Sequence, residues 1–130
     1  MEYRRARIED AENLFMLKND EDVRRFAINK QVIDWDLHIY WLLKNMKNIW
    51  IILADSNEFA GDLRIDNKEL SIRLLKKYRG KGLGSKAIKK FAKRGYTAKI
   101  VDGNIASMRI FVKSGFNFID YKDGVYTLCV

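Results

Sequence analysis

Glycine alternates with other residues in one short stretch of the chain, Arg79–Gly84, which reads Arg-Gly-Lys-Gly-Leu-Gly. A strand-like pattern comes before it and a helical pattern follows at once. The first turn of a helix leaves backbone N–H groups without partners, and these groups, together with the helix dipole, attract phosphate. Glycine allows a phosphate to approach the backbone closely. The stretch therefore predicts a phosphate-binding loop, with a flexible, solvated turn as the alternative.

Positive charge gathers around this loop. The chain has 25 Lys and Arg residues, 17 Asp and Glu residues and a formal net charge of +8. The segment from Leu70 to Val101 holds eleven of the basic residues and no acidic residue, which leaves fourteen basic and seventeen acidic residues elsewhere. All of the surplus positive charge thus belongs to one segment. Such clustering indicates one multiply charged anionic ligand, such as a nucleotide diphosphate.

Two well-known phosphate-binding loops do not fit these residues. The P-loop pattern Gly-x-x-x-x-Gly-Lys-Ser/Thr is absent. The Rossmann fingerprint requires Gly-x-Gly-x-x-Gly, whereas this stretch gives Gly-x-Gly-x-Gly, although Asp102 lies about twenty residues on, where a ribose-binding acid would be. The roughly thirty residues beyond Val101 end in a hairpin and are too few for the further parallel crossovers of a doubly wound domain. Dinucleotide binding is therefore disfavoured.

Alternating strand and helix patterns position the loop. Ahead of it we expect a short strand, two amphipathic helices with Asp34 as the N-cap of the second, and a meander of three strands. Their expected bounds are 3–7 for the first strand, 10–19 and 34–46 for the helices, and 49–54, 59–65 and 69–75 for the meander. After the loop we expect a basic amphipathic helix from Leu83, with Gly95 as its C-terminal stop. The chain then ends in a hairpin at 116–130, whose exposed sheet edge would allow pairing into a homodimer.

Length and composition predict one domain, residues 1–130, with 48% hydrophobic residues. The single cysteine, Cys129, and the single histidine, His38, exclude a disulfide framework and a multi-thiolate zinc site within one chain, so we expect no metal. Charged residues near the N-terminus precede no apolar run, and no stretch approaches ~18 uninterrupted apolar residues. We therefore expect a soluble, cytoplasmic protein with no membrane partner.

The glycine stretch resembles the signature of the GCN5-related N-acetyltransferase (GNAT) family. That signature, Arg/Gln-x-x-Gly-x-Gly/Ala between the fourth strand and the following helix, is matched in full by Arg79–Gly84. Downstream, the segment 104–116 is similar to the family's second motif, in which an Asn and a Ser open a helix that closes with Gly-Phe. Upstream, the segment 7–12 resembles the start of the family's first helix. The resemblance covers nearly the whole chain in consistent order and spacing.

This resemblance implies an α/β (α+β) fold: a mixed, mostly antiparallel sheet with flanking helices and a splayed pair of central strands. It implies an enzyme that transfers acetyl from acetyl-coenzyme A to a primary amine. The loop amides would hold the coenzyme pyrophosphate, and the pantetheine arm would pair with the end of the fourth strand. The implied coenzyme-binding residues are Arg73, Leu74, Leu75, Arg79, Gly80, Lys81, Gly82, Leu83, Gly84, Ser85, Asn104, Ser107 and Phe111. Simple helix capping would explain Asn104 and Ser107 equally well.

Acetyl transfer requires a neutral amine, a polarised thioester carbonyl and a proton for the departing thiolate. Glu69 matches the position of the catalytic base in some family members, with Asp62 and Asp66 as alternatives. Alternatively, Glu69 is an exposed acidic residue of a hairpin with no catalytic role. Where the family commonly places a tyrosine as general acid, this chain has Phe111, which cannot donate a proton. The departing thiolate would then be protonated by water or by another hydroxyl such as that of Tyr78, or it would leave without a dedicated acid.

The first helices wall one side of the acceptor cleft in the family. Segments 19–24 and 33–41 resemble the branch that acts on amino sugars of nucleotide sugars and on ribosomal-protein N-termini, but Leu17-Lys18 replaces that branch's usual Trp-Arg. The resemblance therefore implies a small-molecule or peptide amine as the acceptor, with a nucleotide-linked amino sugar slightly favoured. His38 and Trp41 are the expected acceptor-binding residues, and core packing is their alternative role.

Two other functions follow from the same residues. Phe111 is compatible with a catalytically silent sensor that binds acetyl-coenzyme A. The basic helix is compatible with a nucleic-acid or ribosome-binding module, which would need aromatic side chains interleaved with its lysines for base stacking. Phe91 falls on the apolar face of that helix instead. We therefore expect no nucleic-acid partner.

Overall fold

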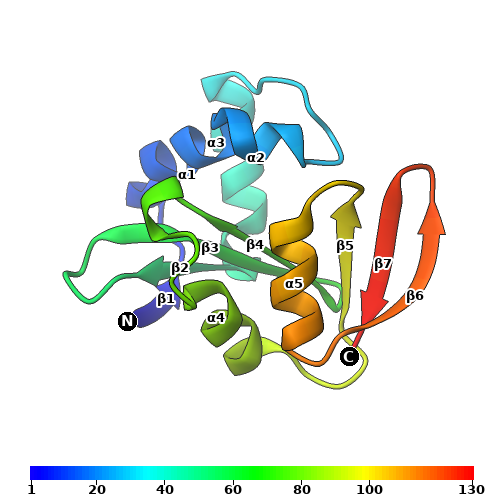
Figure 1. Ribbon diagram of the computed structural model, residues 1–130. Coiled ribbons are helices and arrows are strands. Elements are labelled where there is room, and N and C mark those ends of the chain that lie inside the picture. The colour runs from blue at the N-terminus through cyan, green and yellow to red at the C-terminus, as the bar shows by residue number, and fades with distance from the viewer.

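A seven-stranded sheet organises the computed structural model, which describes residues 1–130. The strands follow the order β1-β2-β3-β4-β5-β7-β6 (Figure 1). Every neighbouring pair is antiparallel except β4 and β5, which are parallel. This architecture confirms the predicted mixed, mostly antiparallel sheet. The strand bounds are Glu2–Arg5 for β1, Ile49–Leu53 for β2, Phe59–Asp66 for β3, Glu69–Leu74 for β4, Thr97–Val101 for β5, Asn117–Lys122 for β6 and Val125–Cys129 for β7.

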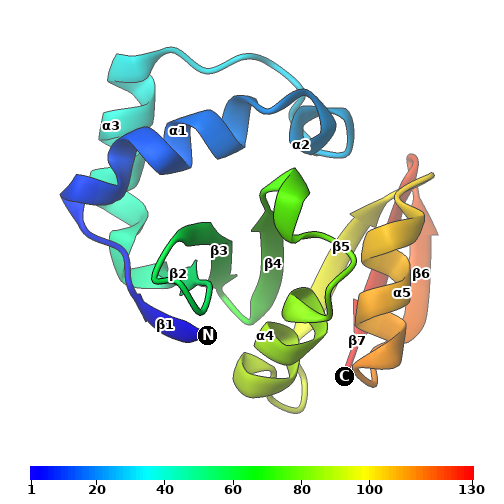
Figure 2. The ribbon, with the colours of Figure 1, turned by 60° about the vertical axis from the view of Figure 1, so that its left-hand side comes forward.

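Five α-helices flank the sheet. They are α1 (Ala11–Asn19), α2 (Glu21–Arg25), α3 (Trp35–Asn45), α4 (Leu83–Phe91) and α5 (Ile105–Lys113), with short 3-10 turns at Ile8–Asp10, Met46–Asn48 and Lys76–Tyr78. Figures 1 and 2 show α1, α2 and α3 gathered at one end of the molecule, while α4 and α5 lie side by side. None of these helices combines the length and the apolar composition needed to cross a membrane.

The sheet separates two apolar cores. Strand β2 contributes to both, because alternate side chains of a strand point to opposite faces: Ile52 belongs to one core, and Ile51 belongs to the other. The larger core lies under α4 and α5 and consists of Ile52, Ala60, Leu63, Leu70, Ala87, Ile88, Ala98, Ile100, Phe111, Phe116 and Leu128. The smaller core lies under α1 and α3 and consists of Ala6, Ala11, Leu14, Leu42, Ile49, Ile51 and Leu53. Both faces of the central strands are therefore covered.

The helix that follows the glycine stretch begins at Leu83, as predicted, but it ends at Phe91, before the predicted stop at Gly95. Ala92 is already extended, with φ −66° and ψ 136°. The amide of Gly95 donates to the carbonyl of Val130 at 2.8 Å, so this connection is tied to the end of the chain. The predicted stop at Gly95 was wrong, because the helix ends four residues earlier and Gly95, with φ +93°, lies in the turn before β5.

The two central strands separate almost as soon as they meet. Pairing between β4 and β5 is confined to Glu69 and Thr97, and Figure 2 shows the strands diverging from that end. Beyond this pair, β4 presents an edge without a strand partner on its β5 side. The splayed pair of central strands is therefore confirmed. At the far end of the sheet, β6 forms an edge on which all six residues are exposed, and pairing of that edge with a second copy stays a prediction.

Candidate functional site

Two adjoining cavities occupy the opening between the splayed strands. We call the smaller one, of about 320 Å³, the loop cavity, because the glycine stretch and the start of α4 line it. We call the larger one, of about 500 Å³, the main cavity; β3, β4, β5 and the segment from α1 to α3 line it. The two share six lining residues, which are Val23, Phe26, Ile72, Arg73, Asn104 and Ser107. A molecule in one cavity can therefore reach a molecule in the other.

The loop cavity is lined by backbone N–H groups that have no acceptor. The first amide to bond into α4 is that of Lys86, which donates to the carbonyl of Gly82 at 3.2 Å. The six amides before it, from Gly80 to Ser85, have no hydrogen-bond partner. Gly80 and Gly82 have φ values of +73° and +82°, a conformation that other residues rarely adopt. This cluster of free donors at a helix N-terminus fits an anion such as phosphate.

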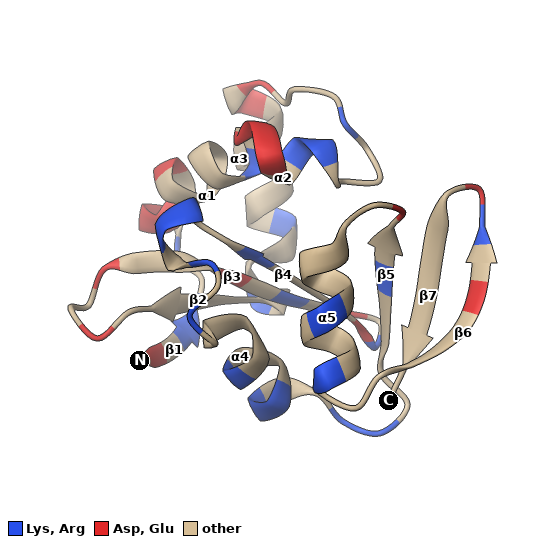
Figure 3. Ribbon diagram, viewed as in Figure 1, with Lys and Arg blue, Asp and Glu red and all other residues tan.

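The Arg79 side chain forms contacts with the end of β4 and with the start of α2. Its Nε donates to the carbonyl of Leu74 at 2.9 Å, and its Nη1 donates to Asp22 Oδ2 at 3.2 Å. A third contact joins its Nη2 to Asp20 Oδ1 at 3.5 Å. The start of α2 is accordingly acidic where it faces the basic glycine stretch, as Figure 3 shows. Arg79 therefore links the end of β4 to α2 and lines the loop cavity with its charge already paired.

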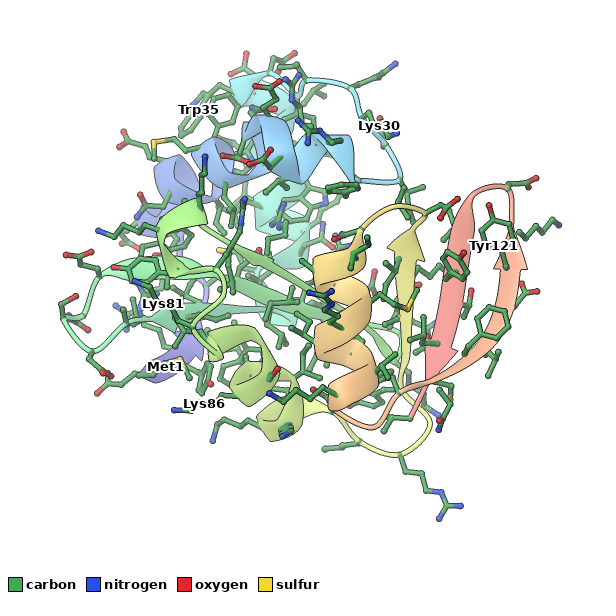
Figure 4. All side chains as sticks on the ribbon, viewed as in Figure 1. Met1, Lys30, Trp35, Lys81, Lys86 and Tyr121 are labelled. Atoms are coloured by element: carbon green, nitrogen blue, oxygen red, sulfur yellow. The ribbon has the colours of Figure 1, made fainter.

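The remaining predicted coenzyme-binding residues divide between the cavities and the surrounding structure. Of the β4 residues, Arg73 and Leu74 line the loop cavity, whereas Leu75 does not and donates its amide to Ala60 at 2.9 Å. Lys81 and Leu83 line neither cavity, and Figure 4 shows Lys81 on the outside of the molecule. Those two positions are therefore not supported as coenzyme-binding residues by the cavity lining.

Asn104 and Ser107 sit at the start of α5 and line both cavities. Asn104 Oδ1 accepts a hydrogen bond from the amide of Ser107 at 3.2 Å, so Asn104 caps the helix. The capping role predicted as the alternative is confirmed, and the same residues remain within reach of a ligand. Phe111, one turn further along α5, lines only the main cavity and packs edge-on against Phe116, with ring centroids 5.0 Å apart.

Glu69 is the one carboxylate among the residues that line the main cavity. The two alternative bases do not reach it. Asp62 has only 2% of its side chain exposed and forms a two-point ion pair with Arg73, through contacts of 2.9 and 2.5 Å. Asp66 is exposed at the β3–β4 turn and lines neither cavity. Of the three predicted candidates, Glu69 alone is positioned to take a proton from a molecule in the main cavity.

His38 and Trp41 both lie on α3 but have different environments. Trp41 lines the main cavity. His38 is fully buried, lines neither cavity, and donates from Nε2 to the carbonyl of Ala11 at 2.9 Å. Burial lowers the pKa of the His38 ring, although the hydrogen bond to Ala11 opposes this shift. His38 therefore packs α3 against α1, as its alternative role predicted, and is not exposed to either cavity.

Tyr78 is directed away from both cavities. Its hydroxyl donates to the carboxylate of Glu58, and this hydrogen bond raises the pKa of Tyr78. The side-chain hydroxyls that line the main cavity are those of Ser71 and Ser107. The proposal of Tyr78 as a general acid therefore has no support in the geometry.

Sequence reasoning missed two cations in the main cavity, Lys18 and Arg64. Lys18 Nζ lies 3.2 Å from the centroid of the Trp41 ring, and Arg64 Cζ lies 5.7 Å from it. The spacing of Asp62 and Arg64 on β3 was the available signal, because residues two apart on a strand share a face. That signal has no meaning until the position of α1 and α3 on the same face is known.

A family model described as "Acetyltransferase (GNAT) domain" matches residues 1–117 of the chain. No curated protein sequence matches it significantly.

Solved structures resemble the chain along almost its whole length. A domain from Methanocaldococcus jannaschii is 22% identical, with 99% of this chain and 96% of that chain covered and a TM-score of 0.83. An acetyltransferase of the GNAT family from Bacillus anthracis is 19% identical, with 98% and 92% covered and a TM-score of 0.81. The spermidine N-acetyltransferase from Vibrio cholerae, in complex with CoA and spermine, is 13% identical, with 99% and 94% covered and a TM-score of 0.82. At these identities the likeness establishes the fold.

Proposed function

The chain belongs to the GNAT acetyltransferase family, and we propose that it moves an acetyl group from acetyl-coenzyme A, bound in the loop cavity, to a primary amine held in the main cavity. One observation carries this proposal. Free backbone amides line one cavity, a single carboxylate lines the other, and the two cavities adjoin between strands that have separated.

The loop cavity has the donor set that a coenzyme A diphosphate requires. The free amides of the lining residues Gly80, Gly82, Gly84 and Ser85 supply hydrogen bonds, and the N-terminus of α4 adds its dipole. The free edge of β4 offers backbone groups to an extended pantetheine arm, in the manner of an added strand. When bound there, acetyl-coenzyme A supplies a thioester as the acyl donor. The spermidine N-acetyltransferase from Vibrio cholerae, which shares the fold, was solved in complex with CoA, and this supports CoA as the ligand.

Glu69 is the proposed general base. A primary amine with a pKa near that of lysine, roughly 10.4, is almost entirely protonated at neutral pH and cannot attack a carbonyl. Glu69 lines the main cavity at the residue pair where β4 and β5 part. A carboxylate at that position accepts the amine proton, directly or through one water molecule.

The departing thiolate needs no dedicated acid in this proposal. A thiol has a pKa of roughly 8.5, so the thiolate is an adequate leaving group at neutral pH. Phe111 takes the position at which the family commonly has a tyrosine, and it closes the wall of the main cavity with an apolar surface. Water then protonates the released thiolate after transfer.

For the acceptor we propose the amino sugar of a nucleotide sugar. The main cavity, at about 500 Å³, is large enough for a sugar ring together with part of a nucleotide. Phe26 gives it an aromatic side chain on which a sugar or a base can stack, whereas the Trp41 ring is already covered by Lys18.

Melting temperatures test the donor half of this proposal. Acetyl-coenzyme A and free coenzyme A should each stabilise the protein, and a ligand at a hundred times its Kd adds about 2.7 kcal/mol. NAD and a short DNA duplex should produce no comparable shift. Stabilisation by DNA alone would support a nucleic-acid-binding module instead.

A free-thiol assay across a panel of amines tests the acceptor half. Release of coenzyme A that depends on an amine supports the enzyme. Stabilisation by acetyl-coenzyme A with no amine-dependent release across the panel would identify the chain as a silent sensor. Mass spectrometry of a nucleotide sugar after the reaction then identifies the acetylated amine.

A further inference from the structure

Two cations without an acidic partner meet at one aromatic ring in the wall of the main cavity. Lys18, near the end of α1, and Arg64, on β3, lie 3.2 and 5.7 Å from the centre of the Trp41 ring. All three side chains line the cavity. Neither cation has a carboxylate within 4 Å, in contrast to Arg73 and Arg79, which are both paired. The pair is therefore available to a ligand.

The charges around this pair do not neutralise it. Arg73 lies in the same wall and forms two hydrogen bonds with Asp62. Asp62 therefore neutralises Arg73 and not Lys18 or Arg64. Lys99 adds a further cation from β5, and Glu69 is the one carboxylate among the lining residues. His38, behind Trp41 on α3, is buried with its pKa lowered, first by burial and then by Lys18 and Arg73. The main cavity thus carries an excess of positive charge on the side of α1 and β3.

A half-buried cation without a counter-ion is unfavourable, because it gives up hydration and gains no partner. Burial, followed by repulsion from Arg73 and Arg64, lowers the pKa of Lys18 to about 7, and the attraction of Asp62 only partly opposes this. An anion placed between Lys18 and Arg64 would remove the repulsion and accept hydrogen bonds from both.

We infer that the acetyl acceptor is an amine whose molecule also carries an anionic group, a phosphate or a carboxylate, and that Lys18 and Arg64 bind this group beside Trp41. The inference rests on the proposed function and goes further by naming the anionic group as the selected feature and the two residues that select it. A polycation such as a polyamine would meet like charge in this cavity and is rejected. Sugar phosphates, nucleotide sugars and amino acids all share the required chemistry.

Matched pairs of amines distinguish the two sources of the anion. Calorimetry in the presence of coenzyme A should compare glucosamine 6-phosphate with glucosamine, and alanine with alaninamide. In at least one pair the anionic member should bind at least about tenfold more tightly, as expected for a charge-assisted hydrogen bond to each cation. Equal or weaker binding of the anionic member in both pairs would overturn the inference. Loss of coenzyme A binding itself would instead refute the proposed function, so the two failures are separable.

Variants assign the effect to the two cations. Lys18→Met and Arg64→Gln should each reduce the preference for the anionic member by about tenfold and leave coenzyme A binding unchanged. Lys18→Arg should retain the preference. Lys44→Met is the matched control, because Lys44 also lies over an aromatic ring, 4.4 Å from the centre of Tyr40, but lines neither cavity. A preference that survives both Lys18→Met and Arg64→Gln would refute the assignment.

The pH dependence provides a readout that a purely structural lysine would not change. Because Lys18 loses its proton near pH 7 in the free protein, the ratio of glucosamine 6-phosphate affinity to glucosamine affinity should fall between pH 7 and pH 9. Titration of the shared sugar amine largely cancels in that ratio. In Lys18→Arg the ratio should stay flat, since arginine keeps its charge. The same fall in both proteins would exclude Lys18 as the anion-binding group.

Discussion

Replacement of Asp62 by asparagine tests how far the wall between the two cavities depends on one buried charge pair. The Asp62 carboxylate is 2% exposed and the Arg73 side chain is 23% exposed, with contacts of 2.9 and 2.5 Å between them. The asparagine side chain keeps the shape but removes the negative charge. Arg73 would then be left without a counter-ion in the same cavity wall as Lys18, with which it shares a mutual repulsion.

The expected loss is large. Breaking a buried ion pair by neutralising one partner costs about 3–5 kcal/mol, out of a total stability of roughly 5–15 kcal/mol for a domain. For a chain of this length, each kcal/mol corresponds to roughly 3–5 °C, so the melting temperature should fall by roughly 10–25 °C. Urea unfolding gives the same quantity from the midpoint, provided that the m-value is unchanged.

Two controls make this result interpretable. Lys77→Met breaks the exposed Lys77–Glu58 pair, whose contact is 2.9 Å and whose side chains are 65% and 52% exposed, and it should leave the melting temperature nearly unchanged. The double variant Asp62→Asn/Arg73→Met removes both charges and should regain most of the lost stability. If Asp62→Asn costs no more than Lys77→Met, or if the double variant recovers nothing, the explanation by an uncompensated buried charge is refuted.

Three further substitutions test other parts of the site. Glu69→Gln should lower kcat by roughly 10²–10⁴-fold with acetyl-coenzyme A affinity unchanged, and an unaltered rate at neutral pH in the free-thiol assay would remove Glu69 as the base. Gly82→Ala should cost about 1–2 kcal/mol, because alanine is strained at φ +82°, and should reduce the thermal shift with coenzyme A; an undiminished shift would contradict the role of the loop amides. Lys18→Met should raise the melting temperature more at pH 6 than at pH 10. The pKa of Lys18 is about 7 in the folded protein, against an ordinary value of 10.5, so its contribution makes the wild-type protein more stable as the pH rises between these two values. The variant lacks this contribution. An equal gain in melting temperature at both values of pH would show that folding does not lower the pKa of Lys18.

Local sequence determined the phosphate-binding loop and the starts of the helices. Glycine at positions 80 and 82 is required by the backbone conformation alone, since a Cβ built at either position meets nothing within 4 Å. Asp34 caps α3 through a hydrogen bond to the amide of Leu37 at 2.9 Å, as the local pattern predicted. These features depend on a few neighbouring residues, and a single sequence is therefore enough to predict them.

Features that depend on distant segments were not predictable in this way. His38 and Trp41 are three residues apart on α3, yet α1 covers His38 and leaves Trp41 at the cavity wall. The Asp62–Arg73 pair requires the register between β3 and β4, in which these two residues are direct partners. The five-residue helix α2 is too short to produce a periodic signal, and it is fixed by the Asp20 cap and by Arg79.

Because β4 and β5 pair at only one residue pair, the sheet consists of two parts, β1 to β4 and β5 to β7, that are joined over a short length. An acyl carrier bound between β4 and β5 would hold the two parts of the sheet together, since it would contact the loop before α4 on one side and α5 on the other. Loading with the carrier should then slow amide hydrogen exchange along the facing edges of both strands and protect the backbone there from proteases. The rigidity of the enzyme, and with it its lifetime in the cell, would follow the supply of its own substrate.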